Sequence, residues 1–171
     1  MTTVQFYFDF GSPNAYLSHK VIPSIEARSP ARFVYIPVLL GGIFKLTGNQ
    51  SPATAFAGIK NKPEYERLEM RRFIERHGLT AYRSNPHFPV NTLQLMRGAV
   101  AAQTAGVFKP YVDAMYPCMW ERELKMDDPA VAAKVWGALE GAVKTIQAAG
   151  FALDAPLGSV QRPAITEAPI A

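Results

Sequence analysis

A serine at the start of a helix is the residue best placed for chemistry in this sequence. Residues 6–17 read FYFDFGSPNAYL, which predicts a strand, a glycine turn and the first turn of a helix. Ser12 is a favourable N-cap residue, and Pro13 suits the first helical position. A helix start carries unsatisfied amide donors and a partial positive charge, which stabilise a thiolate. The hydroxyl of Ser12 can therefore donate a hydrogen bond to a sulfur anion held there.

The residues from Ser12 to Ala15 also exclude one kind of sulfur chemistry. Thioredoxin-like proteins begin the helix after their first strand with a C-x-x-C motif. Here Ser12 replaces the attacking cysteine and Ala15 replaces the resolving cysteine, which excludes dithiol exchange. The thiol would have to arrive on another molecule, and glutathione is the obvious candidate. Plain capping is the simpler interpretation of Ser12, and GSP lacks the G-x-S-x-G frame of a serine hydrolase.

Local patterns predict the elements that position Ser12. Residues 3–10 alternate between apolar and polar positions, with Asp9 on the polar side, as expected of a strand. A helix is predicted over 13–27 and a second, buried strand over 31–40. Strand, helix and strand form a βαβ unit with a right-handed crossover.

The rest of the chain predicts helices joined by loops. Residues 41–52 contain three glycines and are predicted as a loop, without the lysine-serine ending of a phosphate-binding loop. Further helices are expected at 63–77, 93–106, 108–121 and 129–149. Gly78 is the expected stop of the first of these helices, and Thr92 is the expected cap of the second. Asp128 is the expected cap of the last, and residues 155–171 are expected to be weakly ordered.

Composition excludes several classes of protein. A hydrophobic content of 49% supplies a packed core, and a net charge of +4 from scattered lysines and arginines is far from a nucleic-acid-binding pattern. The single cysteine, Cys118, excludes an internal disulfide, and the three histidines lack metal-ligand spacing. No apolar run is long enough to cross a membrane, and the N-terminus has no signal-peptide pattern. We therefore expect a cytoplasmic protein that binds no nucleic acid, membrane or metal.

Several segments together resemble one family. They are FYFDFGSPNAYL, TGNQSP, GIKNKPEYERLEMRRFIERHGL, NPHFPVNTLQLMRGA and LKMDDP. Over residues 3–134 the chain resembles the 2-hydroxychromene-2-carboxylate isomerases, which are DsbA-like relatives of the kappa-class glutathione transferases. The resemblance implies an α/β, thioredoxin-like fold with an inserted helical domain. It divides the chain into a βαβ portion at 1–40, a helical insertion at 41–134 and a divergent helix with a poorly ordered tail at 135–171.

The same resemblance implies a glutathione-dependent isomerase of aromatic degradation, in which Ser12 faces the glutathione sulfur. In this family glutathione is thought to add reversibly to an unsaturated aromatic pyruvate, so that rotation and elimination give the other isomer. The substrate would be a small aromatic keto acid, and the protein could form a homodimer. The resemblance suggests further positions near glutathione or the substrate: Asn49, Lys60, Lys62, Phe88, Pro89 and Asn91. For Phe88, burial in the core is an equally good interpretation.

The chain departs from the family after residue 134. Relatives continue into a β-hairpin and a final helix, and the residues from 135 onward show no such pattern. Two alternatives therefore stay open beside the isomerase. One is a kappa-like glutathione transferase that acts on another electrophile, and the other is an inactive, truncated remnant.

Overall fold

A computed structural model describes residues 1–138, 144 and 148 of the chain. Strand β1 (Thr2–Phe8), helix α1 (Pro13–Arg28) and strand β2 (Ala31–Pro37) form the predicted βαβ unit. The two strands are parallel, and Phe6 lies opposite Tyr35. Both strands end earlier than predicted. After β1, Asp9 turns its carboxylate back onto the amide of Gly11. After β2, the amide of Val38 still donates to the carbonyl of Phe8 at 3.0 Å, and a helix begins at Leu40. Within the described residues the sheet has these two strands.

The prediction of a loop over residues 41–52 is wrong, because this part of the chain contains two helices. Helix α2 (Leu40–Thr47) begins directly after β2, and the short α3 (Pro52–Ala55) follows, capped by Ser51. Helix α2 ends at Gly48, whose φ of 63° is the left-handed conformation that glycine adopts without strain. The glycines at the start of α2 therefore lower its helix propensity without preventing the helix.

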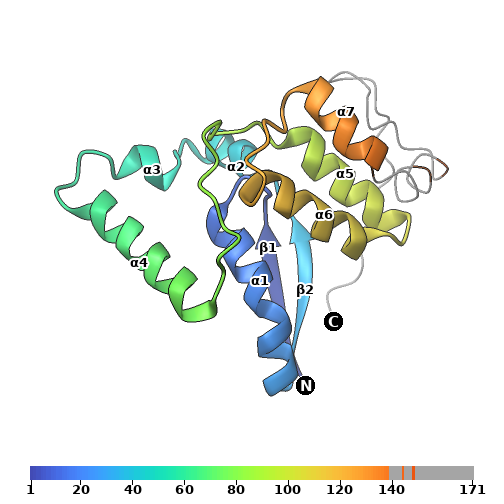
Figure 1. The fold of residues 1–171 in the computed structure, drawn as a ribbon, viewed down its shortest axis with the longest axis horizontal. Helices are drawn as coiled ribbons and strands as arrows, with labels where there is room; N and C mark the ends of the chain where they lie inside the picture. The colour runs from blue at the N-terminus through green and yellow to red at the C-terminus, as the bar shows by residue number, and fades with distance from the viewer. Residues whose placement is uncertain (139–143, 145–147, 149–171) are drawn as a thin grey trace.

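Helix α4 (Lys62–His77) ends at Gly78, as predicted, with a φ of 62° at that glycine. Helices α3 and α4 project away from the sheet as an arm, and the turn between them lies at its outer end (Figure 1). No residue of α4 is fully buried. Met70, Phe73 and Ile74 pack partly against the core, so the arm is attached by one apolar stripe.

Helices α5 (Leu93–Thr104), α6 (Phe108–Trp120) and α7 (Pro129–Ala138) lie on the other side of the βαβ unit (Figure 1). Helix α6 contacts α1, and α5 contacts β2. Gly98 of α5 allows the ring of Tyr111 to approach closely, because a Cβ atom there would collide with that ring. The predicted helix to residue 149 extends beyond the described part of the chain, and the tail lies outside it.

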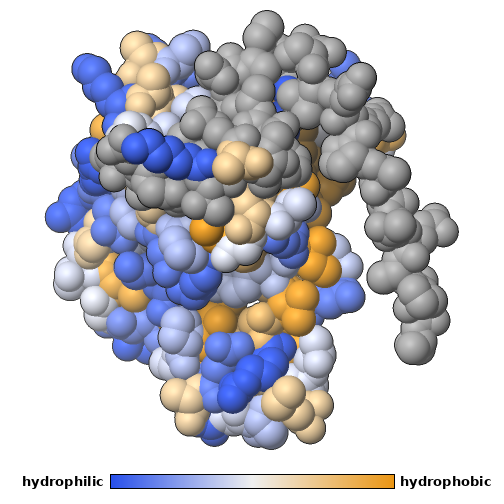
Figure 2. All heavy atoms as spheres, turned by 90° about the vertical axis from the view of Figure 1, so that its right-hand side faces the viewer, coloured by the Kyte–Doolittle hydropathy of each residue, from blue (hydrophilic) through white to orange (hydrophobic). Residues whose placement is uncertain are grey.

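The core is built largely from aromatic side chains of α6, α1 and the end of β1 with the turn after it. The largest buried aromatic side chains are Phe8, Phe10, Tyr16, Tyr111, Tyr116 and Trp120. The ring centroids of Phe10 and Tyr116 are 4.9 Å apart, edge to face, an arrangement that aromatic pairs prefer. On the face that forms the right-hand side of Figure 1, the described apolar residues are scattered among hydrophilic ones (Figure 2). Within the described residues, no helix has the length and apolar character needed to span a membrane.

Candidate active site

The turn between β1 and α1 places Ser12 at the first turn of α1. Its backbone is extended, with φ −96° and ψ 114°, and its Oγ accepts a hydrogen bond from the amide of Ala15 at 3.2 Å. Its own amide donates to the carbonyl of Asp9 at 3.0 Å. The predicted N-cap is therefore confirmed. Ser12 as a whole is half-buried.

Two donors stay available at this helix start. The hydroxyl hydrogen of Ser12 forms no hydrogen bond to a described residue, because the Ala15 contact uses the oxygen as an acceptor. The amide of Asn14 also has no partner in the described part of the chain, and Pro13 carries no amide hydrogen. An exposed anion could therefore receive one hydroxyl donor and one amide donor, together with the positive end of the α1 dipole.

Asp9 holds this turn against two distant segments, which sequence reasoning missed. Alternation predicts Asp9 on the polar face of the strand, but only 3% of the residue is exposed. Its carboxylate accepts hydrogen bonds from the amides of Gly11 and Leu40 at 2.8 and 2.7 Å. It also accepts one from the hydroxyl of Thr92 at 2.6 Å. The one local feature that could have indicated this role is an acidic residue close to a glycine turn.

The hydrogen bond from Thr92 to Asp9 holds the loop over residues 83–92 beside the Ser12 turn. Thr92 stands at the predicted N-cap position of α5, but its side chain makes no capping hydrogen bond, and its hydroxyl donates to Asp9 instead. The side-chain oxygen of Asn91 instead accepts from the amide of Leu93 at 3.1 Å. At the other end of the loop, buried Asn85 donates to the carbonyl of Met119 at 2.9 Å. The loop is thus fixed at both ends.

Phe88 and Pro89 stand in the middle of this loop, joined by a cis peptide bond. Phe88 is 42% exposed, which excludes the interpretation of a core residue. Its ring centroid lies 6.1 Å from that of Trp120. The indole of Trp120 donates to the carbonyl of Phe10 at 2.7 Å. Phe88 is therefore linked to the Ser12 turn through one buried side chain.

Asn49 and Lys62 make their polar contacts with residues close to them in the sequence, not with Ser12. Asn49 is exposed in the α2–α3 connection, and its side-chain oxygen accepts from the next amide in the chain. Lys60 and Lys62 stand at the outer end of the arm (Figure 1). The ammonium of Lys62 lies 3.4 Å from Glu66 and 5.3 Å from the ring centroid of Phe56. Its charge is thus balanced within the arm.

The arm also contains a shallow pocket of about 290 Å³ between α3 and α4. Its walls are formed by Pro52, Ala53, Phe56, Pro63, Glu66, Arg67 and Met70. None of the predicted site residues lines it. Among the described residues, no group of three or more histidine, cysteine or acidic side chains could hold a metal ion.

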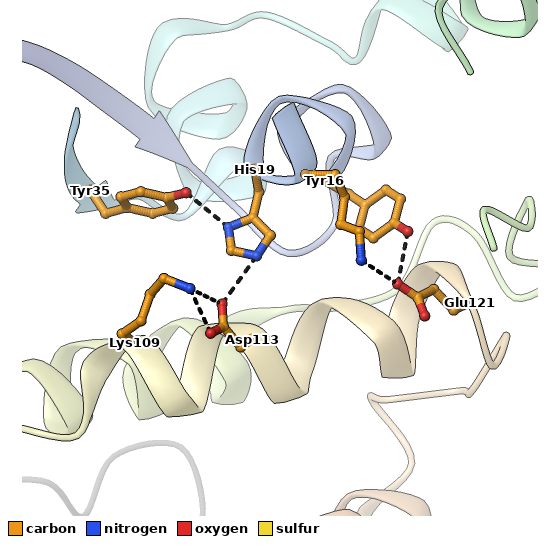
Figure 3. A network of polar contacts seen from close by, with 7 residues as sticks. Tyr16, His19, Tyr35, Lys109, Asp113 and Glu121 are labelled. Carbon is orange, nitrogen blue, oxygen red and sulfur yellow. Dashed lines mark hydrogen bonds and ion pairs between the residues drawn. The ribbon is translucent and has the colours of Figure 1, made fainter. Parts of the chain in front are cut away.

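A second polar network, which no sequence pattern predicts, lies between α1, β2 and α6 (Figure 3). The Nδ1 atom of His19 is 2.9 Å from the hydroxyl of Tyr35, and its Nε2 atom is 3.3 Å from Asp113. Burial lowers the pKa of His19 to about 4 and outweighs the attraction of Asp113. The imidazole is therefore neutral, donating to Asp113 and accepting from Tyr35, so this contact is a hydrogen bond rather than an ion pair.

The chain's cysteine is not part of either network. Cys118 is buried in α6, and its thiol donates to the carbonyl of Ala114 at 3.2 Å. Burial raises the pKa of this thiol. The interpretation of Cys118 as an unreactive residue agrees with this environment.

Comparison with known proteins gives the family. No curated protein sequence matches the chain. A solved structure of SeMet 2-hydroxychromene-2-carboxylate isomerase has a similar fold, with a TM-score of 0.60 and 20% sequence identity over 85% of this chain and 71% of that chain. A model of the DSBA-like thioredoxin domain matches residues 3–151, past residue 134 where the resemblance seen in the sequence ended. Because that match includes most of the chain, the protein belongs to the family of DSBA-like thioredoxin domains.

Proposed function

We propose that the chain binds glutathione at the Ser12 turn and is an isomerase of the 2-hydroxychromene-2-carboxylate type, acting on a small aromatic keto acid. The observation that carries the proposal is the hydroxyl of Ser12. Its oxygen accepts from the amide of Ala15, while its hydrogen has no acceptor among residues 1–138 at this helix start. A half-buried hydroxyl of this kind suits an exposed anion better than a neutral group.

The residues at the turn fit a thiolate in particular. Ser12 donates one hydrogen bond, the amide of Asn14 lies next to it, and the dipole of α1 favours negative charge. Ala15 and the buried Cys118 leave no protein thiol that could form a disulfide with a bound sulfur. The site can therefore stabilise a thiolate without consuming it.

Glutathione, when bound, supplies the sulfur nucleophile that adds reversibly to an unsaturated substrate. The chain contributes orientation and a surface for the substrate. Phe88 exposes part of its ring beside Trp120, and a flat aromatic substrate can stack on it. A protein whose one cysteine is reduced and buried suits the reducing cytoplasm, where glutathione is abundant as the thiol.

The first experiment measures glutathione binding by thermal shift and the pKa of the bound thiol by ultraviolet absorbance. Glutathione should raise the melting temperature by mass action, and the pKa of its thiol should fall on binding. S-methylglutathione, which cannot ionise at sulfur, should stabilise less. If glutathione gives no shift, the chain is better explained as an inactive remnant.

Variants of Ser12 separate thiolate binding from helix capping. Ser12→Asp keeps a good cap but places a negative charge against the sulfur, so it should retain stability and lose the low thiol pKa. Ser12→Thr keeps the hydroxyl and should retain both. Ser24→Ala, near the other end of α1, is the matched control. Wild-type thiol behaviour in Ser12→Asp would contradict the proposal.

The second experiment follows the absorbance of a hydroxychromene carboxylate with glutathione present. Turnover should fall about a hundredfold when the Ser12 hydroxyl is removed, as for other donors to developing anions. If the product keeps glutathione covalently attached, the chain is a kappa-like transferase rather than an isomerase. The same Ser12 turn would serve either reaction.

A further inference from the structure

The carboxylate of Asp9 joins three segments that are distant in the sequence. It accepts from Gly11 in the turn before α1, from Leu40 at the start of α2, and from Thr92 at the start of α5. All three distances lie between 2.6 and 2.8 Å, the short range of hydrogen bonds to a charged acceptor. Asp9 is 3% exposed, so water cannot readily replace any of these donors.

The same residue also sets the position of Ser12 through the backbone. The carbonyl of Asp9 accepts from the amide of Ser12 at 3.0 Å. Its side chain and main chain thus hold both sides of the Gly11 turn. The Asp9 carboxylate is therefore coupled to the Ser12 turn through the amide of Gly11.

We call the meeting point of these three segments at Asp9 the junction. Gly11 and Thr92 lie close together there. A Cβ atom on Gly11 would lie 3.1 Å from Cγ2 of Thr92 and 3.4 Å from Oδ1 of Asp9. The first distance is tighter than a comfortable carbon–carbon contact. The turn that carries Ser12 and the loop that carries Phe88 are therefore packed together with no spare room.

We propose that Asp9 and Thr92 are positioning residues, whose carboxylate–hydroxyl hydrogen bond aligns the Ser12 hydroxyl with the loop over residues 83–92. This inference rests on the proposed function, because the alignment matters for a thiolate and its substrate. A carboxylate is required rather than an amide, since donors approach both oxygens. In an asparagine, one amide group would face another N–H or O–H donor.

Thr92→Val tests the junction, because it removes the hydroxyl and keeps the shape of the side chain. In the protein alone, the amides of Gly11 and Leu40 should exchange their hydrogens about tenfold faster, since a charged acceptor has lost one of its three donors. With glutathione, the pKa of the bound thiol should rise toward its free value. Thr92→Ser should restore both properties. Thr104→Val, at the exposed end of α5, should change neither.

Gly11→Ala tests the junction by crowding it. The new methyl group meets Cγ2 of Thr92, so turnover should fall at least about tenfold through misalignment of Ser12. Thr92→Ser removes that methyl and keeps the hydroxyl, so the double variant should recover. A double variant no better than Gly11→Ala would contradict the packing argument.

The outcomes separate this inference from the proposed function. If the wild-type protein lowers the thiol pKa of glutathione and Thr92→Val does so equally well, the positioning role is wrong and the proposed function stands. Faster exchange in Thr92→Val with an unchanged thiol pKa also overturns it, because the junction would then be only structural. If the wild-type protein does not bind glutathione, the proposed function fails and the positioning role fails with it.

Discussion

Around Ser12 the polar groups find partners far along the chain, whereas the α3–α4 arm pairs its charges within itself. Asp9 bonds to Thr92, Asn85 to Met119, and the indole of Trp120 to Phe10. On the arm, the ion pairs are all one helical turn apart, as between Arg67 and Glu64 or Arg72 and Glu69. Long-range bonds fix one segment relative to another, and exposed pairs within a helix contribute little. These long-range hydrogen bonds can hold the side chains of a site in fixed positions near the turn, and the ion pairs within α4 cannot do the same for the arm.

The largest effect is expected from truncating the core beside the turn. Phe10 is fully buried between Tyr111 and Tyr116, so Phe10→Ala should lower the free energy of unfolding by about 3–5 kcal/mol. Tyr65→Ala on the arm, where 53% of the residue is exposed, should cost no more than about 0.5 kcal/mol. Urea unfolding measures both. Equal costs would show that the arm is as tightly packed as the core.

The next effect is a pH dependence that comes from His19. Its pKa is about 4 in the folded protein and 6.5 when unperturbed, so the unfolded chain binds the proton more tightly. The free energy of unfolding contributed by neutral His19 is fully present above pH 6.5 and should fall by about 3 kcal/mol as the pH drops to 4. His19→Gln should flatten this part of the profile. His77→Gln, on the exposed end of the arm, should leave it as in the wild type.

A smaller difference in stability is expected between two asparagine variants, one near the turn and one near the arm. Asn85 is buried and donates to the carbonyls of Met119 and Leu124 at 2.9 and 3.0 Å, so Asn85→Ala should cost about 1–3 kcal/mol. Asn49 is exposed and bonds to its neighbour in the chain; Asn49→Ala should change stability by less than about 0.5 kcal/mol. Thermal unfolding in parallel measures the pair. A stable Asn85→Ala would mean that the loop is not fixed through α6.

The smallest effect is expected from the arm lysines on glutathione binding. Lys60→Ala and Lys62→Ala should each change the dissociation constant by less than about twofold, because both stand at the outer end of the arm and Lys62 is already paired. Isothermal titration measures this. A tenfold loss in either variant would mean that the arm closes over the Ser12 turn when glutathione binds.

Local signals were enough to predict much of the scaffold. Alternation in β1, the cap at Ser12 and the stop at Gly78 depend on neighbours within a few residues, and all three are present. Helix α2 is harder to predict, because its two glycines favour a loop although Leu40, Ile43 and Phe44 follow helical spacing.

The candidate site was less predictable because its contacts are not local. Asp9 is separated from Leu40 by 31 residues and from Thr92 by 83. No pattern around Asp9 reports those partners, and alternation alone places it on the polar side. Thr92 was assigned as a cap for the same reason. Its residue type suits a cap, and its actual acceptor is on another segment.

The burial of Cys118 has a consequence for how this protein meets oxidative stress. Its thiol is directed to the carbonyl of Ala114 and is hard to ionise, so peroxides and alkylating agents find no reactive thiolate of the protein to attack. Under the proposed function, the reactive sulfur is exchanged with the surrounding pool at every binding event. Damage to that sulfur would be diluted by fresh glutathione rather than accumulated in the polypeptide.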